Sequence, residues 1–228
     1  MKKILLAFLA LSVAIISCKK DKSTPMVATT GNYMSLTANS TWQYKTVNNL
    51  MVNNDSVIYT VTSSNRDSTI NSKIYHVLTT TNGPNQYRNI TGNDYYTFQA
   101  LPEALGGSTV ETIYLKDNVA ANGNWSQLYN ISASGLPVTI NLINTITEKG
   151  IGRTVNGIAY TDVIHVTTTL SISLLGSPLP TGAVVTDIQN YYAKKVGMIE
   201  SKNKISINFS GITNNIDQLT TLERADIK

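Results

Sequence analysis

The stretch Ser56-Val57-Ile58-Tyr59-Thr60-Val61-Thr62 decides the fold class, because its side chains alternate between apolar and polar with a period of two. Successive side chains of a β-strand point to opposite sides, so one face carries Val57, Tyr59 and Val61. Similar alternation recurs at Ile74–Leu78, Thr109–Leu115, Val138–Ile146, Tyr160–Leu174 and Lys204–Phe209. Breaks that contain Asn or Gly separate these runs and predict turns, at 53–55, 82–85, 92–94 and 156–157. The pattern predicts an all-β protein.

The composition favours strands and turns over helices. The 12 Tyr far outnumber the 3 Phe, and charged residues make up only 14% of the chain. Thr and Tyr favour half-buried pleated surfaces, and Asn favours turns. A short helix is predicted at Pro102–Leu105, before Gly106-Gly107, and we expect at most one or two short helices in all.

Two parts of the chain resemble each other and predict an internal repeat. The 16 residues of Thr60–Tyr75 align without a gap with Thr145–Tyr160, at an offset of 85. Upstream, Asn39 and Trp42 match Asn122 and Trp125 at an offset of 83, which predicts that both tryptophans are equivalent core anchors. Downstream, Tyr87 and Gly92 match Tyr192 and Gly197 at an offset of 105, which places an insertion at 169–185. Chance similarity in a Thr-rich β protein remains the alternative to duplication.

The repeats suggest one domain over residues 32–228, with repeat one at about 36–100 and repeat two at about 119–209. Neither copy has enough strands to bury a core of its own. We therefore expect one strongly curved antiparallel sheet, a half-barrel, with apolar side chains on its concave face.

The N-terminus has the layout of a secretory signal. Lys2 and Lys3 precede the apolar stretch Ile4–Ile16, and Ser17 is a small residue before Cys18. The stretch has 13 residues, whereas a transmembrane helix needs about 20. The run Ile15-Ile16-Ser17-Cys18 resembles the lipobox of bacterial lipoproteins, which implies cleavage after residue 17 and acyl chains, palmitate among them, on Cys18. Residues 18–31 are then a flexible tether, and a structural cysteine is the alternative.

Removal of the signal lowers the net charge of the chain, because two lysines leave with it. The net charge of +4 includes Lys2 and Lys3, and without them 16 basic side chains face 14 acidic ones, a net charge of +2. No basic run with interleaved aromatic residues follows, which argues against a nucleic-acid partner. Cys18 is the only cysteine, so its lipidation leaves no thiol for a disulfide, a metal or a nucleophile.

Two motifs carry a family resemblance. Asn39-x-x-Trp42-x-Tyr44 and the run Tyr191–Ile199 (YYAKKVGMI) resemble small Gram-negative outer-membrane lipoproteins of unknown role. Some of these are similar in fold to lipoprotein-carrier half-barrels, whose groove holds acyl chains. The resemblance implies an outer-membrane location, on either face, and a groove, and it transfers no functional residue.

No catalytic, metal or cofactor site is predicted. His76 and His165 are isolated within strand patterns, and a metal site needs three or four ligands, so both histidines are expected to be structural or solvent-facing. No Gly-x-Ser-x-Gly nucleophile elbow is present. Glu103 and Glu111 are the best of several dispersed carboxylates, and their spacing selects no glycosidase pair.

The tyrosine pairs are the candidate ligand or partner contacts. In Tyr95-Tyr96 and Tyr191-Tyr192 one ring of each pair is expected to face inward and the other outward. Ser56 and Ser68 lie in Asp-Ser-Val and Asp-Ser-Thr, which resemble a short O-glycan acceptor pattern.

Three functions remain open. The first is a non-enzymatic, monomeric, lipid-anchored envelope protein that binds an apolar or acyl ligand, or a protein partner. The second is a structural or interaction lipoprotein with a filled core and no small ligand. A hydrolase is the third and the least favoured.

Overall fold

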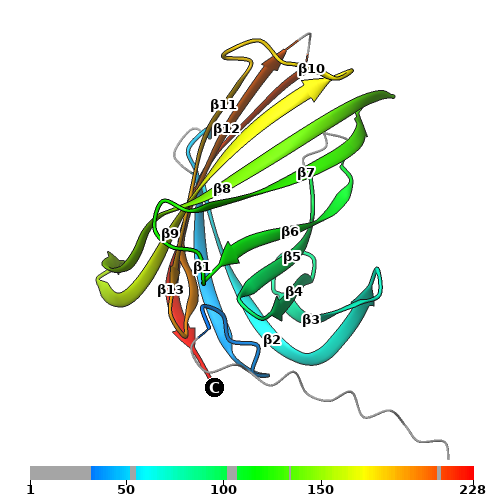
Figure 1. The fold of residues 1–228 in the computed structure, drawn as a ribbon. Helices are drawn as coiled ribbons and strands as arrows, with labels where there is room; N and C mark the ends of the chain where they lie inside the picture. Colours follow the sequence, from blue (N-terminus) through cyan, green and yellow to red (C-terminus); the bar gives the residue numbers. More distant parts are fainter. Residues whose placement is uncertain (1–31, 52–54, 102–106, 134, 210–211) are drawn as a thin grey trace, which may run out of the picture.

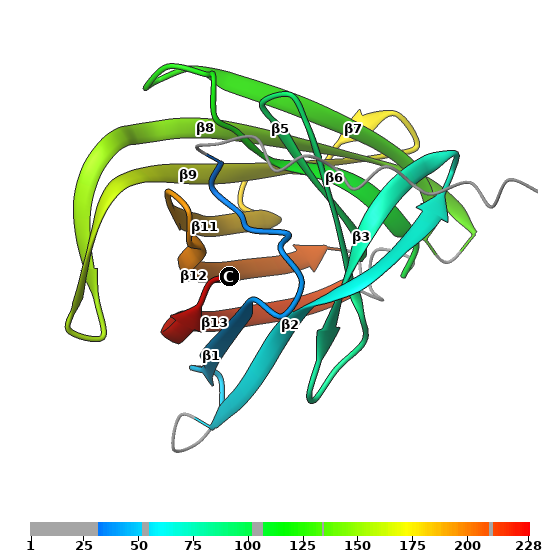
Figure 2. The same cartoon turned by 90° about the horizontal axis from the view of Figure 1, so that it is seen from below.

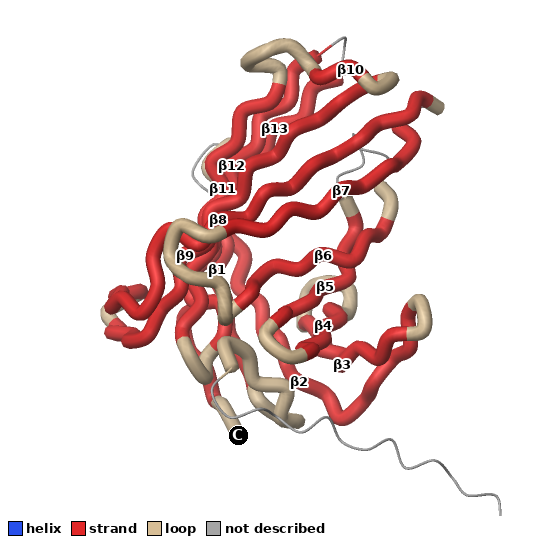
Figure 3. Tube along the Cα trace, in the orientation of Figure 1, coloured by secondary structure: helices blue, strands red, loops and turns tan. Residues whose placement is uncertain are grey.

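A computed structural model of the chain describes residues 32–51, 55–101, 107–133, 135–209 and 212–228. These residues form one 13-stranded antiparallel sheet, and no helix occurs among them (Figure 3). The strands are β1 (Thr41–Asn48), β2 (Ser56–Ile70), β3 (Lys73–Thr80), β4 (Gln86–Thr91), β5 (Asp94–Ala100), β6 (Thr109–Lys116), β7 (Asn124–Ala133), β8 (Leu136–Val155), β9 (Ile158–Leu174), β10 (Ser177–Pro178), β11 (Val184–Ala193), β12 (Gly197–Phe209) and β13 (Ile212–Asp226). The predicted fold class is confirmed, and the predicted helix at 102–105 lies outside the described residues.

The order of strands across the sheet is β6-β5-β4-β3-β2-β1-β13-β12-β11-β9-β8-β7, with the short β10 paired to β9 (Figure 1). Nearly every neighbouring pair is a sequential hairpin. The exceptions are β9, which pairs with β11 on the far side of the short β10, and β1, which pairs with β13 and so joins the two ends of the domain. The chain therefore folds as one continuous sheet that curves round an interior.

The predicted alternation places side chains on the inner and outer faces of this sheet. Tyr59 and Val61 of β2 face the interior, whereas Ile58 between them is more than half exposed. Val57 was predicted on the same inner face, but it is the second residue of β2 and its side chain is exposed. The same period continues in β12, where Ser201, Asn203 and other alternate residues point inward.

The curvature brings the two edge strands, β6 and β7, together without a backbone ladder. Side chains of β7 reach the backbone of β6 instead: Trp125 Nε1 donates to the Ile113 carbonyl at 2.9 Å, and Gln127 Oε1 accepts from the Ile113 N–H at 2.7 Å. Tyr129 OH donates to the Glu111 carbonyl at 2.9 Å. We call this contact the seam. It satisfies edge groups that would otherwise be free to pair with another chain, and it makes the sheet a nearly closed barrel.

Residues 33–40 cross the lower end of the barrel (Figure 2). We call this segment the plug. The Tyr33 N–H donates to Tyr95 OH at 3.0 Å, and Trp42, the second residue of β1, donates its indole N–H to the Val196 carbonyl at 2.7 Å. Gly197 has a φ of +108°, and a Cβ there would lie 3.2 Å from Met34 Sδ. The larger hydrophobic core surrounds the plug and closes this end.

A smaller apolar cluster lies farther along the strands, around Val138, Ile140, Ile172 and Ile207. The far end of the β8–β9 hairpin forms a separate feature, an arm that bends at several β-bulges (Figure 1). Asn156 at its tip donates to the Leu222 carbonyl of β13 at 3.0 Å, so the arm packs back on the barrel.

The structure shows parallels between the two predicted repeats. The Asn39 N–H donates to the Ser63 carbonyl at 2.8 Å, and the Asn122 N–H donates to the Ile146 carbonyl at 2.6 Å. Both asparagines have positive φ, 68° and 67°. Trp42 and Trp125 are both buried.

The strand pairing gives a different offset between the two predicted repeats from that of the gap-free sequence alignment. Trp42 pairs with Val61 and Trp125 pairs with Asn144, so the offset on β2 and β8 is 83, whereas the turns at Asn71 and Asn156 differ by 85. The β-bulges between these points absorb the two extra residues. The duplication itself stays a prediction.

Candidate ligand-binding cavity

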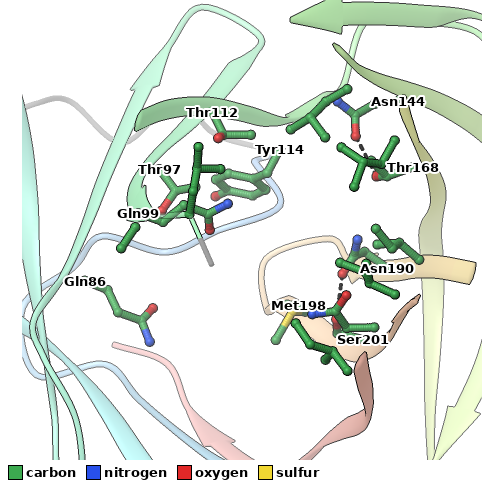
Figure 4. A pocket seen from close by; sticks show the side chains of 18 of the residues that line it. Gln86, Thr97, Gln99, Thr112, Tyr114, Asn144, Thr168, Asn190, Met198 and Ser201 are labelled. Carbon is green, nitrogen blue, oxygen red and sulfur yellow. Dashed lines mark hydrogen bonds between the residues drawn. The ribbon is translucent and has the colours of Figure 1, made fainter. Parts of the chain in front are cut away.

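The barrel encloses a cavity of about 830 Å³ above the plug. Among the described residues, side chains of β1–β6, β8, β9 and β11–β13 line it. Figure 4 shows polar side chains from several strands, such as Gln99, Thr168 and Asn190, around the same open space. The volume is in the range typical of small-molecule sites, roughly 300–1,000 Å³.

Four tyrosines form an aromatic part of the lining. Tyr44 and Tyr59 have ring centroids 5.7 Å apart, and Tyr114 and Tyr192 have centroids 5.5 Å apart. Burial is the main cause that raises the pKa of all four hydroxyls above the ordinary value. They are therefore neutral hydrogen-bonding groups at physiological pH.

Apolar side chains line much of the remaining wall. They come from β8, β9, β11, β12 and β13, and include Ile140, Leu142, Leu170, Ile188, Ile205 and Ile216. The prediction of an interior rich in Leu, Ile, Val and Tyr therefore describes only part of the cavity, because hydroxyl and amide side chains share the wall.

Asn144 is a polar lining residue with a buried donor that lacks a hydrogen-bond partner among the described residues. It is only 4% exposed, and its Oδ1 accepts from Thr168 Oγ1 at 2.6 Å. Its Nδ2 has no partner in the described structure. A buried donor left unsatisfied costs about 1–3 kcal/mol, so a ligand acceptor at this place would be favoured.

Arg88 is the one charged side chain among the described lining residues. Its Nη2 donates to Gln86 Oε1 at 3.0 Å, and its Cζ lies 5.0 Å from the centroid of the Tyr114 ring. None of the ion pairs in the described residues involves Arg88. Sequence reasoning missed Arg88 because a single arginine in a strand carries no motif.

The structure separates the four predicted tyrosine contacts. Tyr192 lines the cavity, whereas Tyr95 is buried in the core, where its hydroxyl donates to Asp117 Oδ2 at 2.7 Å. Tyr96 lies outside the cavity lining, with Lys73 Nζ 3.1 Å from its ring centroid. Tyr191 also lies outside that lining.

Tyr191 belongs to a cluster between the arm and the barrel. His165 stacks on its ring with centroids 4.1 Å apart, and the Cζ of Arg153 lies 3.4 Å from the ring centroid. His165 Nδ1 is 3.0 Å from Glu148 Oε2, and Arg153 Nη2 donates to Glu200 Oε1 at 2.6 Å. The cluster packs the arm in place, and no group of three or more potential metal ligands occurs in the described parts of the chain.

The remaining predicted positions that the structure describes are separate from the cavity. Glu103 lies outside the described residues, and Glu111 forms an ion pair with Lys73. Ser56 is exposed at the start of β2, and Ser68 is partly exposed farther along the same strand. No structural feature brings these residues together into one site.

His76 belongs to an arrangement that resembles a catalytic triad. Its Nε2 is 2.9 Å from Ser63 Oγ, and its Nδ1 is 3.0 Å from Asp67 Oδ1. The turn at Asn71-Ser72 is the feature of the sequence that indicates the contact between Asp67 and His76, because it sets these two residues opposite each other in the β2–β3 hairpin. A search for nucleophile-elbow motifs could not find it.

The geometry does not activate Ser63. Its side chain is fully buried, and its hydroxyl donates to the Leu36 carbonyl of the plug at 3.0 Å. Since a hydroxyl has one proton, its oxygen accepts from the His76 ring in this arrangement, which is the reverse of what a general base requires. The three residues therefore fasten the plug to the sheet.

A serine-directed fluorophosphonate reagent is accordingly expected to leave Ser63 unmodified in the folded protein. Ser63→Ala is expected to lower the free energy of unfolding by about 1–2 kcal/mol, because Leu36 and His76 lose a hydrogen-bond partner. Intact-mass spectrometry and urea denaturation measure the two effects. Stoichiometric labelling that disappears in both Ser63→Ala and His76→Asn would show instead an activated nucleophile.

No family model matches the chain, and no curated protein matches it. One solved structure, described as a "putative lipoprotein" from Parabacteroides distasonis ATCC 8503, aligns over 85% of this chain and 98% of its own, with 11% identity and a TM-score of 0.49. Within the described residues, no helix has the length and apolar character needed to cross a membrane.

Proposed function

We propose that this chain is a non-enzymatic, lipid-anchored protein of the cell envelope that holds a small ligand inside its barrel. The observation that carries the proposal is the cavity of about 830 Å³, closed below by the plug and lined by both apolar and polar side chains. Small-molecule sites typically combine a mostly apolar wall with a few placed polar groups.

The anchor in this proposal rests on the sequence. A signal of 17 residues followed by Cys18 places the acyl chains at the start of the mature protein, and an outer-membrane location follows from the motif resemblance. Residues 18–31 would then connect the lipid to the plug. The barrel would stand beside the membrane.

Two features favour ligand binding over an interaction module with a filled core. The interior retains a cavity large enough for a small molecule. The seam also covers part of the β6 edge with β7 side chains, which leaves less of that edge open for pairing with a partner strand.

A titration with the neutral fluorescent probe N-phenyl-1-naphthylamine tests the proposal. Thr168 points into the cavity, whereas Thr169 beside it on β9 is exposed. We expect saturable one-site binding by the wild type and by the control Thr169→Trp, and binding at least about tenfold weaker in Thr168→Trp, because the indole projects into the cavity and occupies space that the probe would otherwise use.

Circular dichroism would establish that both tryptophan variants are folded. The proposal fails if the wild type shows no saturable binding. It also fails if a folded Thr168→Trp binds the probe as well as Thr169→Trp does.

A further inference from the structure

Arg88 lies in a polar row that crosses three neighbouring strands of the cavity wall. The register sets Arg88 of β4 opposite Thr97 of β5, and Thr97 opposite Thr112 of β6. All three side chains line the cavity, and the two threonines are buried. The row therefore presents one guanidinium and two hydroxyls to the same interior space.

The guanidinium of Arg88 has no anionic partner in the described structure. No carboxylate of the described residues lies within 4 Å of it, whereas Arg153 on the arm pairs with Glu200. Gln86 and the ring of Tyr114 hold the Arg88 side chain in place and leave most of its five donors unused. A cation in a partly enclosed cavity favours an anion beside it.

Asn144 supplies an independent observation across the seam. It is 4% exposed and lines the cavity, and its Nδ2 lacks a partner among the described residues. Asn144 pairs in register with Trp125, whose indole donates to the carbonyl of Ile113, the residue before Tyr114. The seam therefore joins the strands that carry Asn144 and Trp125 to β6, the last strand of the polar row that contains Arg88.

The surrounding groups do not oppose a negative charge. No Asp or Glu is present in the described lining, and burial raises the pKa of Tyr44, Tyr114 and Tyr192, so these rings stay uncharged. The apolar side chains of the remaining wall suit a hydrocarbon body.

We propose that the cavity binds an amphiphile with one anionic headgroup, which pairs with Arg88 and accepts from nearby polar donors, while its apolar body lies against the Ile and Leu side chains. This inference rests on the proposed function and names the ligand class for the same cavity. A carboxylate or a phosphate monoester could form the bidentate pair with arginine.

Displacement of bound N-phenyl-1-naphthylamine by four amphiphiles, each with a ten-carbon chain, tests this proposal directly. The wild type is expected to bind decanoate and decyl phosphate more tightly than decanol, and decyltrimethylammonium most weakly. In Arg88→Met, the affinity for both anions is expected to fall about 10- to 100-fold, the effect of losing hydrogen bonds to a charged group, while the affinity for decanol stays unchanged.

Two variants serve as controls. Lys45 follows the inward Tyr44 on β1 and is not part of the cavity lining, so Lys45→Met removes one positive charge outside the cavity and is expected to leave anion affinity unchanged. Arg88→Lys keeps the charge without the planar fork and is expected to give an intermediate affinity for the anions. Comparison of decanoate with decyl phosphate identifies the preferred headgroup.

The outcomes separate this inference from the proposed function. If the probe binds, but anions and decanol displace it equally and Arg88→Met changes nothing, the anionic-ligand inference is wrong while the ligand-binding proposal stands. If the wild type fails to bind the probe or any of the amphiphiles, both are wrong.

Discussion

Trp42→Ala is expected to lower the free energy of unfolding by about 3–5 kcal/mol, the range for truncating a large buried aromatic side chain. Trp42 is 1% exposed, and its indole donates to the Val196 carbonyl at 2.7 Å. It lies where the plug, β1 and the turn before β12 meet, so its removal leaves a void and an unpaired carbonyl. Urea denaturation followed by circular dichroism measures the loss.

Gln43→Ala is the matched control for this substitution. Gln43 is the next residue of β1 and is partly exposed, so its truncation is expected to change stability by less than about 0.5 kcal/mol. A loss below about 1.5 kcal/mol in Trp42→Ala would contradict the role assigned to the plug contact.

Tyr95→Phe is expected to cost about 2–3 kcal/mol, although it removes a single oxygen atom. The Tyr95 hydroxyl accepts from the Tyr33 N–H at 3.0 Å and donates to Asp117 Oδ2 at 2.7 Å. The substitution leaves the Tyr33 N–H and the Asp117 carboxylate without the Tyr95 hydroxyl as a hydrogen-bond partner, and places them next to an apolar ring. The same denaturation measurement applies.

Tyr96→Phe provides the comparison, because Tyr96 is the neighbouring residue with its ring on the other face. Its hydroxyl is only partly buried and lies 3.4 Å from Asp94 Oδ2, so we expect a loss below about 0.5 kcal/mol. Equal effects of the two substitutions would show that the Tyr95 hydroxyl does not hold the plug.

The all-β fold could be predicted because the alternation in the sequence is a local signal. Tyr59 and Val61 point inward as their period of two requires, and Trp42 and Trp125 are both buried as their matching positions predicted. The strong curvature of the sheet was also predicted. The approach of β6 to β7 was not, because the seam uses side-chain contacts between separate hairpins and has no periodic pattern.

The candidate site was harder to predict than the fold. Adjacent tyrosines were expected to face opposite sides, but only tertiary packing decides that Tyr192 lines the cavity while Tyr95 supports the plug. Arg88 lacks any local signature, since its significance depends on which groups surround it. The repeat alignment used an offset of 85, and the bulges that change the register to 83 on β8 leave no clear mark in the sequence.

The contact of Ser63 with His76 illustrates the same limit. Asp67 lies opposite His76 in the β2–β3 hairpin, and this pairing can be worked out from the position of the turn at Asn71. Ser63 joins them only because a β-bulge shifts the strand, and its burial depends on the plug. Sequence spacing alone could predict neither the arrangement nor its structural role.

Native mass spectrometry of the mature protein, purified from its own host, tests most directly whether the barrel holds a ligand. We expect a reproducible added mass on the wild type and on Thr169→Trp, released on denaturation and absent from Thr168→Trp. Bare wild-type protein at the mass of the lipidated chain would show that the barrel holds no tightly bound ligand.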